Sequence, residues 1–383
     1  MKIKRIIEEK IRGKLLKSPR KIIIIYGPRQ VGKTTLAKDI LNKINKKIIT
    51  INADESRYID ILSSRDSRKM SRLISDYEVL FLDEAQRVPD IGINLKILFD
   101  QFPHLKIITT GSSSFELANQ VQESLVGRTW TYKLYPISFL ELKEDKTDFE
   151  IREQLEERMI FGSYPEIFSL ENDQDKKKFL AEITGSYLYK DVFELAQIKS
   201  PSKIRDLLKL LSFQIGNEVS MNNLSSNLGM AKETVMRYVD LLEKSFVIFR
   251  LSGFSRNLRK EVRKKDKIYF YDLGIRNAVI DNLKSLKDRF DRGQIWENYL
   301  IAERKKYLDY LDIQAGSYFW RVHTGAEVDY LEESEGSLNT FEFKWSKNKK
   351  ARIPKSFLDT YPSSNFSLIN SDNFESFLSN SHH

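Results

Sequence analysis

The feature that most constrains the fold is the stretch IIIIYGPRQVGKTT at residues 22–35. Ile22 to Tyr26 form an apolar run that is too short for a surface helix, which predicts a buried strand of a parallel sheet. The next eight residues fit the pattern G-x-x-x-x-G-K-[ST] at every fixed position. A chance Gly-Lys turn is the alternative. The amphipathic helix predicted after the loop, with Leu36, Ile40 and Leu41 on one side, argues against it.

This loop predicts a phosphate site. Two glycines let the backbone wrap so that its N–H groups point at phosphate oxygens, and the following helix adds its positive N-terminal end. Lys33 would reach the β and γ phosphates, and the Thr34 hydroxyl would bind Mg²⁺. We therefore expect ATP and Mg²⁺ as cofactors, with the nucleotide held by Gly27, Pro28, Arg29, Gln30, Val31, Gly32, Lys33, Thr34 and Thr35.

A second predicted apolar strand ends in two acidic residues. It lies within YEVLFLDEAQ, residues 77–86, and its tip carries Asp83 and Glu84. A carboxylate at the end of a buried strand is costly unless it has a partner. We expect Asp83 to hold the Mg²⁺ shell and Glu84 to polarise the attacking water, which makes hydrolysis plausible as well as binding. Two acids capping a helix are the alternative.

Polar residues follow the next strand, within HLKIITTGSSS at residues 104–114. Thr110, Ser112 and Ser113 are candidates to sense the γ-phosphate, and a hydroxyl-rich helix cap is the alternative for each. Further on, Arg128 lies in a short Gly-Arg turn. It is a candidate catalytic arginine for the site of a neighbouring subunit, and a surface arginine without a role is the alternative.

Several short motifs together resemble one protein family. They are YGPRQVGKTTL, LFLDEAQRVP, TTGSSS, SLVGRTW, LYPISFLEL, GSYPEI, YLYKDV and KIYFYDLGIRN. The chain is similar, from about residue 18 to about residue 370, to prokaryotic AAA-superfamily ATPases whose C-terminal half is a domain of unknown function with a restriction-endonuclease-like core. The resemblance implies ATPase chemistry, and it places Arg128 where the family suggests an arginine finger.

The middle of the chain has helical periodicity. Similar ATPases place a small helical lid at 136–200, and Ser200-Pro201 is typical of a boundary. Residues 203–250 then predict three helices and a strand, the order of a winged helix-turn-helix. Lys232, Thr234 and Arg237 would lie on the exposed side of the third helix, and the basic segment 256–267 would form or flank the wing. A protein-packing module is the alternative.

The C-terminal part places acidic residues and one lysine on a predicted helix and two predicted strands. Glu297 is expected near the start of a helix, Glu327 and Asp329 on one face of a strand, and Glu342 and Lys344 on one face of the next strand. This layout resembles that of restriction-endonuclease-like nucleases. Asp329 and Glu342 would ligate Mg²⁺, Glu297 would add or orient a ligand, and Lys344 would position or activate water.

Other residues near this layout have weaker assignments. The run of Lys347, Lys349, Lys350 and Arg352 would hold a nucleic-acid backbone. Asp272, at the end of another strand, is expected to help hold the domain in place and not to act as a ligand. Charged pairs across strands need no function, and the same fold hosts inactive binding modules, so a domain without nuclease activity is the alternative.

Composition bounds the remaining possibilities. The 383 residues favour two or three domains, and no cysteine is present, which excludes disulfides and thiolate chemistry. The four histidines are too scattered to argue a metal site. Charges throughout the N-terminus predict no secretory signal, and no apolar run is long enough for a membrane span, so we expect a cytoplasmic protein without membrane contact. A net charge of +9 leans towards nucleic acid.

The overall expectation is an α/β chain in five parts. They are a P-loop ATPase core with a parallel sheet at 1–135, a helical lid at 136–200, a winged-helix domain at 201–285, a restriction-endonuclease-like α/β domain at 286–372 and a tail at 373–383. The predicted function is a Mg²⁺-dependent ATPase that binds nucleic acid, DNA rather than RNA, and carries a metal-dependent nuclease domain regulated by nucleotide state. Homo-oligomers would form if Arg128 acts in trans. The alternative is a regulatory or signalling ATPase whose C-terminal half only binds protein or DNA.

Overall fold

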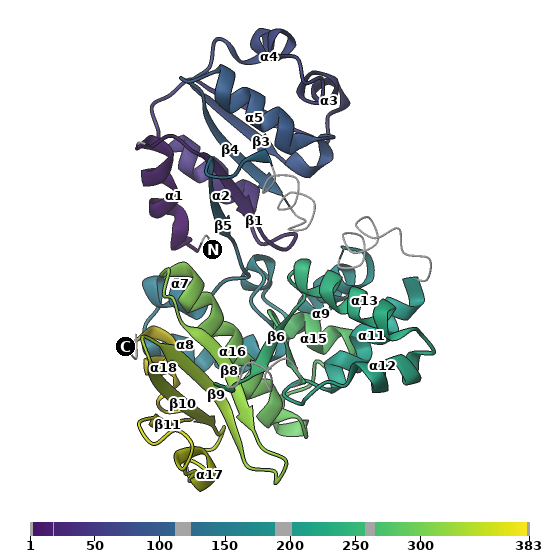
Figure 1. Cartoon of the computed structure of the whole chain (residues 1–383), viewed down its shortest axis with the longest axis vertical. Helices are drawn as coiled ribbons and strands as arrows, with labels where there is room; N and C mark the ends of the chain where they lie inside the picture. Colours follow the sequence, from purple (N-terminus) through teal and green to yellow (C-terminus); the bar gives the residue numbers. More distant parts are fainter. Residues whose placement is uncertain (1–2, 18, 112–123, 188–200, 257–264, 381–383) are drawn as a thin grey trace. The chain divides into compact units, whose positions relative to one another are not determined.

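The chain folds into two compact units in the computed structural model (Figure 1). The structure describes residues 3–17, 19–111, 124–187, 201–256 and 265–380. Of these, residues up to 137 and the short piece 244–246 belong to the first unit, and the others belong to the second. In the described ranges, no helix is both long enough and apolar enough to cross a membrane.

The first unit is built on a five-stranded sheet in the order β2-β3-β4-β1-β5, and every neighbouring pair is parallel. Parallel strands need crossover connections, and helices supply them here. The strands are β1 (Ile22–Tyr26), β2 (Ile48–Asn52), β3 (Val79–Asp83), β4 (Lys106–Gly111) and β5 (Thr129–Lys133). The helices are α1 (Ile7–Leu16), α2 (Lys33–Asn42), α3 (Ser56–Leu62), α4 (Ser67–Ile74), η1 (Ala85–Arg87) and α5 (Ile91–Gln101).

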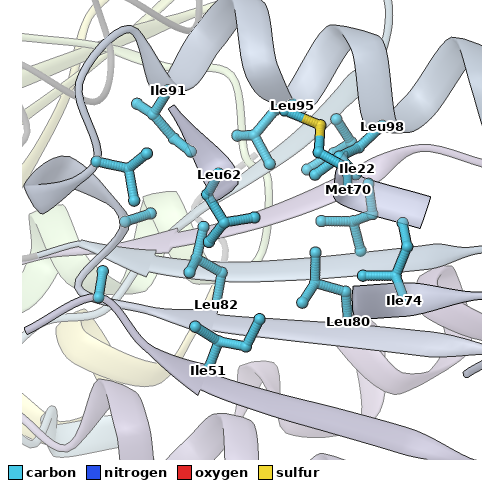
Figure 2. Close-up of a cluster of buried hydrophobic side chains, with 14 of the residues drawn as sticks. Ile22, Ile51, Leu62, Met70, Ile74, Leu80, Leu82, Ile91, Leu95 and Leu98 are labelled. Atoms are coloured by element: carbon cyan, nitrogen blue, oxygen red, sulfur yellow. The ribbon is translucent and has the colours of Figure 1, made fainter. Parts of the chain in front are cut away.

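Apolar side chains fix this sheet between its helices. Leu80 and Leu82 of β3 share one hydrophobic cluster with Leu95 of α5 and Met70 of α4, and all four are fully buried (Figure 2). Burial of side chains of this size stabilises the fold by about 1.5–3 kcal/mol each. The predicted strand at 22–26 and the predicted buried residues of the following helix are confirmed.

The second unit begins with a helical region. Its elements are α7 (Phe139–Asp145), α8 (Asp148–Phe161), η2 (Pro165–Phe168), α9 (Asp173–Glu182), the π-helix η3 (Ile183–Tyr187), α11 (Pro201–Phe213), α12 (Met221–Leu228) and α13 (Lys232–Lys244). Gly229 ends α12 in the left-handed conformation, at φ 59°, which glycine adopts without steric cost. The three helices predicted within residues 203–250 are present as α11, α12 and α13. On α13, Lys232 and Arg237 are exposed as predicted, whereas Thr234 is partly buried.

A six-stranded mixed sheet forms the rest of the second unit, in the order β11-β10-β9-β8-β6-β7. Its strands are β6 (Ile248–Gly253), β7 (Lys267–Phe270), β8 (Gly316–Arg321), β9 (Glu327–Ser334), β10 (Ser337–Phe343) and β11 (Asn365–Ile369). The accompanying helices are α15 (Leu273–Val279), η4 (Leu286–Asp288), α16 (Arg292–Tyr310), α17 (Lys355–Leu358) and α18 (Phe374–Ser379). The elements from α16 to β11 follow the order α-β-β-β-α-β.

One sheet thus crosses the boundary predicted between residues 285 and 286. The β6–β7 hairpin follows the three helices α11 to α13, and β6 also pairs in parallel with β8 through Ser252 and Gly253. The hairpin and the strands β8 to β11 therefore share one hydrogen-bonded sheet. Some predicted features lie outside the described residues, namely Ser112, Ser113, residues 188–200 of the predicted lid, residues 257–264 of the predicted wing and residues 381–383 of the tail predicted for 373–383.

Candidate nucleotide site and carboxylate pocket

The glycine-rich loop follows β1 and leads directly into α2. Gly27 approaches the backbone so closely that an added Cβ would lie 2.0 Å from the carbonyl oxygen of Leu134. Gly32 takes φ 92°, a conformation that favours glycine, immediately before the helix. Lys33 is buried, and its Nζ donates hydrogen bonds to the carbonyls of Gly27 (3.0 Å) and Pro28 (2.7 Å). The lysine ammonium is therefore held over the loop that the sequence predicts to cradle phosphates.

Hydroxyl groups surround the carboxylate at the tip of β3. The Oγ1 of Thr34 donates to both oxygens of Asp83, at 3.0 and 2.9 Å. The Oγ1 of Thr110, from the neighbouring strand β4, also donates to Asp83. Thr110 is fully buried and accepts a hydrogen bond of 3.3 Å from the backbone N–H of Glu84. Residues from β3, β4 and α2 thus meet at the carboxyl edge of the sheet, as the sequence predicted.

Glu84 has an unusual backbone conformation. Its φ is 52°, in the left-handed region that a non-glycine residue seldom adopts. Its carboxylate accepts a hydrogen bond of 2.5 Å from the side-chain amide of Gln86. Strained residues of this kind cluster at active sites, where the surrounding structure holds them in place. Gln86 thereby fixes the direction of the predicted catalytic carboxylate.

The donor set fits a magnesium nucleotide. A threonine hydroxyl and a strand-end carboxylate lie in contact, and oxygen donors of this kind suit Mg²⁺, which binds through one or two carboxylates, waters and phosphates. The lysine and the N-terminus of α2 supply positive charge for the phosphates on the same loop. The residues present therefore fit both predicted cofactors.

The second unit contains a pocket of about 590 Å³. Its lining includes four carboxylates and the two lysines that contact them, namely Glu297, Glu327, Asp329, Glu342, Lys267 and Lys344. Glu297 comes from α16, Lys267 from β7, and the other acids from β9 and β10. All five residues that the sequence singled out here, including Lys344 just after β10, thus line one cavity.

Lys267 is the centre of one half of this pocket. Its side chain is only 1% exposed, and its Nζ lies 3.1 Å from a Glu297 oxygen and 2.5 Å from a Glu327 oxygen. Tyr269, also on β7, donates a hydrogen bond of 2.5 Å to the same Glu297 oxygen. Burial alone would lower the pKa of Lys267, but the two carboxylates outweigh burial and raise it. The lysine is therefore a permanent cation inside the pocket.

Glu297 itself titrates far from its ordinary range. Its pKa is raised to about 7, because burial and the charge of Asp329 together outweigh the opposite effects of Lys267 and Tyr269. A carboxyl group with a pKa near neutrality is typical of functional sites, because it changes charge at physiological pH.

The other half of the pocket holds Asp329, Glu342 and Lys344. The Nζ of Lys344 lies 2.6 Å from a Glu342 oxygen and 3.9 Å from an Asp329 oxygen. The Asp329 carboxylate also accepts a hydrogen bond of 2.8 Å from the backbone N–H of Phe343. Burial raises the pKa of both acids; the charge of Glu327 adds to the rise in Asp329, and the charge of Asp329 adds to the rise in Glu342. The predicted shared face of Glu342 and Lys344 is confirmed by their contact.

Magnesium fits only this second half. Asp329 and Glu342 are partly buried and suitable oxygen ligands once the 31% exposed Lys344 turns away from them, and Mg²⁺ needs no more than two carboxylates when waters and phosphates complete its shell. In the part of the chain that the structure describes, however, no group of three or more acidic or histidine side chains is close enough together to hold a metal ion. Glu297, which is tied to Lys267 and Tyr269, is not placed as a third ligand.

Three family models match successive parts of the chain. Residues 19–143 match a model described as an AAA domain. The first unit carries an AAA-type P-loop ATPase domain. Residues 152–286 and 292–381 match two models, each described as a domain of unknown function (DUF8612 and DUF4143). The AAA match contains the whole phosphate loop together with Asp83, Glu84 and Thr110.

Related proteins span most of the chain. An uncharacterized protein of Methanocaldococcus jannaschii is 29% identical over 348 residues, which is 85% of this chain and 75% of that protein. The replication-associated recombination protein A of Haemophilus influenzae is 33% identical over 130 residues, 32% of this chain and 27% of that protein. A solved Walker-type ATPase of Pyrococcus abyssi aligns with a TM-score of 0.48 at 17% identity, covering 71% of this chain and 94% of that one.

Arg128 lies far from the nucleotide loop within the AAA domain. Its carbonyl accepts a hydrogen bond from the N–H of Ile22, the first residue of β1, whereas the loop follows the last residue of that strand. Five strand residues separate the two positions, roughly 16 Å at the usual rise. The Arg128 guanidinium pairs with Asp100 at 3.1 Å. Arg128 is thus placed away from the site of its own chain, and a role in trans stays a prediction.

Several residues of these sites were not predicted. Arg5 is buried and donates hydrogen bonds to the carbonyls of Val31 (3.2 Å) and Tyr135 (2.5 Å). It therefore ties the phosphate loop, through Val31, to the chain at Tyr135. Gln86 and Tyr269 were also missed. Lys267 was predicted as part of the basic wing segment 256–267, and it is buried in the pocket instead. Asp272, by contrast, has the predicted structural role: it is buried, caps α15 through the N–H of Ile275 and accepts a hydrogen bond of 2.7 Å from Ser163.

Proposed function

We propose that the chain is a Mg²⁺-dependent ATPase whose second unit acts on nucleic acid. The observation that carries the ATPase half is the contact between Thr34 and Asp83 at the carboxyl edge of the sheet, with Glu84 next to it. It joins a phosphate loop, a metal-binding carboxylate and a candidate base, which are the three parts that phosphoryl transfer to water requires.

Each residue of the AAA domain has a defined task in this proposal. Lys33 and the loop N–H groups bind the β and γ phosphates, while Thr34 and Asp83 hold Mg²⁺, which neutralises the charge developing on the phosphates. Glu84, directed by Gln86, orients a water molecule and accepts its proton. Thr110 joins Asp83 and Glu84 through its hydroxyl, so it links the metal-binding and water-binding residues.

In the second unit, we propose that Asp329 and Glu342 hold Mg²⁺ against a phosphodiester and that Lys344 positions the attacking water. The support is the common pocket, the raised pKa values of the two acids and the order α-β-β-β-α-β of the elements. Winged-helix contacts with DNA through Lys232 and Arg237 belong to the same proposal, supported by their exposure and by the net charge of +9.

The decisive experiment measures ATP hydrolysis and nucleic-acid cleavage in parallel. Supercoiled, linear and single-stranded DNA and RNA are incubated with Mg²⁺ and with ATP, a non-hydrolysable analogue or no nucleotide. We expect Lys33→Ala to lose hydrolysis, and Lys344→Ala to lose cleavage and retain hydrolysis. Wild-type protein that hydrolyses ATP but cleaves no substrate under any condition would contradict the nuclease half alone.

A second candidate is a regulatory ATPase whose C-terminal half binds without cleaving. One observation favours it: every acid of the pocket already lies beside an ammonium group, Glu297 and Glu327 beside Lys267, and Glu342 and Asp329 beside Lys344. Under this alternative, Asp329→Ala leaves every DNA-related activity unchanged. Salt-sensitive DNA binding by the wild type would then separate a DNA-binding module from a protein-binding one.

Catalysis in trans by Arg128 is the third part of the proposal. An arginine finger contributes about 10³- to 10⁵-fold to turnover, whereas an exposed ion pair such as Arg128–Asp100 is worth at most about 1 kcal/mol of stability. We expect Arg128→Ala to be inactive, and a mixture of Arg128→Ala and Lys33→Ala proteins to recover activity. Full activity of Arg128→Ala alone would exclude the finger.

A further inference from the structure

An exposed aromatic ring stands at the carboxylate pocket. Phe290, in the short connection between η4 and α16, is 107% exposed and still lines the cavity. Burying a phenylalanine side chain stabilises a protein by about 1.5–3 kcal/mol, so a fully exposed ring forgoes that gain. A ligand that covers the ring on binding would recover it.

The neighbours of Phe290 define the chemistry of such a ligand. Arg292 and Lys349 are exposed cations that line the same pocket, and Trp345, partly buried, adds a second aromatic side chain. The carboxylates of Asp329 and Glu342 lie in that pocket as well. Cations, aromatic rings and metal-binding acids in one cavity match phosphates, bases and a phosphodiester, respectively.

We propose that Phe290 stacks on an unpaired base, so that the pocket takes a single-stranded or frayed segment of nucleic acid and not an intact duplex. This rests on the proposed function of the pocket in nucleic-acid chemistry. A base offers its face to a side chain only when it is unstacked from its neighbours, as in single strands and ends. A cavity of about 590 Å³ lies within the range of small-ligand pockets, about 300–1,000 Å³, so it has room for a nucleotide.

A folded protein partner fits the pocket less well. Interfaces between proteins are depleted in charge at their centre, whereas this cavity is lined by four acids, three lysines and two arginines. The exposed cations next to the ring also favour a polyanion, since Arg292 and Lys349 can neutralise phosphates on either side of a stacked base.

The test measures the binding of a fluorescein-labelled DNA strand and of its blunt duplex by anisotropy, using the full chain in EDTA without nucleotide. Stacking on an aromatic side chain contributes about 1–3 kcal/mol per base, so we expect Phe290→Ala to bind the single strand about tenfold more weakly. Phe290→Trp should retain the affinity. Phe149→Ala, which removes a 69% exposed ring on α8, is the matched control and should bind like the wild type.

A second variant separates stacking from charge. Arg292→Gln should weaken binding and reduce the dependence of log affinity on log salt by about 0.7, the value for one phosphate contact on a single strand, whereas Phe290→Ala should leave that slope unchanged. Wild-type affinity of Phe290→Ala for the single strand would overturn the proposal. An equal loss in Phe149→Ala, or an equal loss on the duplex, would also overturn it.

The outcome is independent of cleavage, because EDTA removes the metal. Protein that binds the strand through Phe290 but cleaves nothing in Mg²⁺ would support this inference and contradict the nuclease assignment. Protein that cleaves normally while Phe290→Ala binds the single strand like the wild type would overturn this inference alone.

Discussion

In the candidate nucleotide site, the residues predicted to bind phosphate come from nine consecutive positions, 27 to 35, whereas the carboxylate pocket takes its four acids from α16, β9 and β10. The two sites also treat their acids differently. Asp83 is hydrogen-bonded by two threonine hydroxyls. Glu297 and Glu327 instead share one ion-pair partner, the ammonium group of Lys267.

This difference determines what each site can bind. A hydroxyl group can stay beside a carboxylate when a cation arrives, because it offers its own oxygen as a ligand. An ammonium group cannot, because its charge competes with the metal for the same oxygens. The candidate nucleotide site thus keeps its oxygens available for Mg²⁺, whereas both pairs of acids in the pocket contact an ammonium group. Lys267 is 1% exposed and stays beside its acids, but Lys344 is 31% exposed and can turn to solvent when a metal binds Asp329 and Glu342.

The largest effect is expected at Lys33. Replacing it by alanine should lower ATP affinity and turnover about 10³-fold, because removing one partner of a buried charged contact costs about 2–5 kcal/mol or more. Nucleotide binding by calorimetry and phosphate release measure the two quantities. Lys38→Ala is the matched control, since Lys38 is exposed on the same helix. Equal losses in both variants would mean that the loop is not the nucleotide site.

The phosphate loop could be predicted from sequence because its function depends on the backbone of consecutive residues. Glycines at fixed spacing and a strand before them are both visible in the letters. Asp83 and Glu84 were predicted because a carboxylate at the tip of a buried strand is costly without a partner. The sheet supplies the reason that they meet the loop and Thr110: parallel strands bring their carboxyl ends to one edge.

The surroundings of Lys267 and Arg128 could not be predicted from sequence patterns. Lys267 begins the strand KIYF, a position that predicts a solvated side chain, and only the pairing of distant strands buries it beside Glu297 and Glu327. For Arg128, the sequence does not tell at which end of β1 its turn lies, so its separation from the loop became visible only in the sheet register. In both cases tertiary contacts decide the role of a charged residue.

The next effect separates hydrolysis from binding within the nucleotide site. Glu84→Gln should retain ATP affinity and lower turnover about 10²- to 10³-fold, the usual contribution of a general base. The amide keeps the shape of the side chain, and it removes the charge that accepts a proton from water. Trapped, unhydrolysed ATP in a rapid filtration assay would show the effect. Unchanged turnover would assign the proton acceptor elsewhere.

Glu297 in the pocket should make the stability of the protein depend on pH. Because the pKa of Glu297 is raised to about 7 in the folded chain, its contribution to stability is complete below the unfolded value of about 4.5 and is lost as pH rises through 7. Across this window, the wild type should lose about 2–3 kcal/mol relative to Glu297→Gln, which imitates the protonated form. Urea unfolding at several pH values measures the difference.

Glu153→Gln supplies the control for that experiment, because Glu153 is an exposed acid on α8 of the same unit. Its unfolding curve should shift with pH as the wild-type curve does. If Glu297→Gln unfolds with the same pH dependence as the wild type, Glu297 does not change charge between pH 4.5 and 7. Lys267 would then keep Glu297 ionised throughout this range, and the two halves of the pocket would not differ in charge.

The smallest effect is expected at Gln86, which directs the carboxylate of Glu84. Gln86→Ala removes the hydrogen bond of 2.5 Å to Glu84 and leaves the phosphate loop intact. A single hydrogen bond contributes about 1 kcal/mol, so turnover should fall about fivefold while ATP affinity stays constant. Adding Gln86→Ala to Glu84→Gln should cost less than the sum of the single changes, because Gln86 acts through Glu84. Additive losses would instead mean that Gln86 contacts water or phosphate directly.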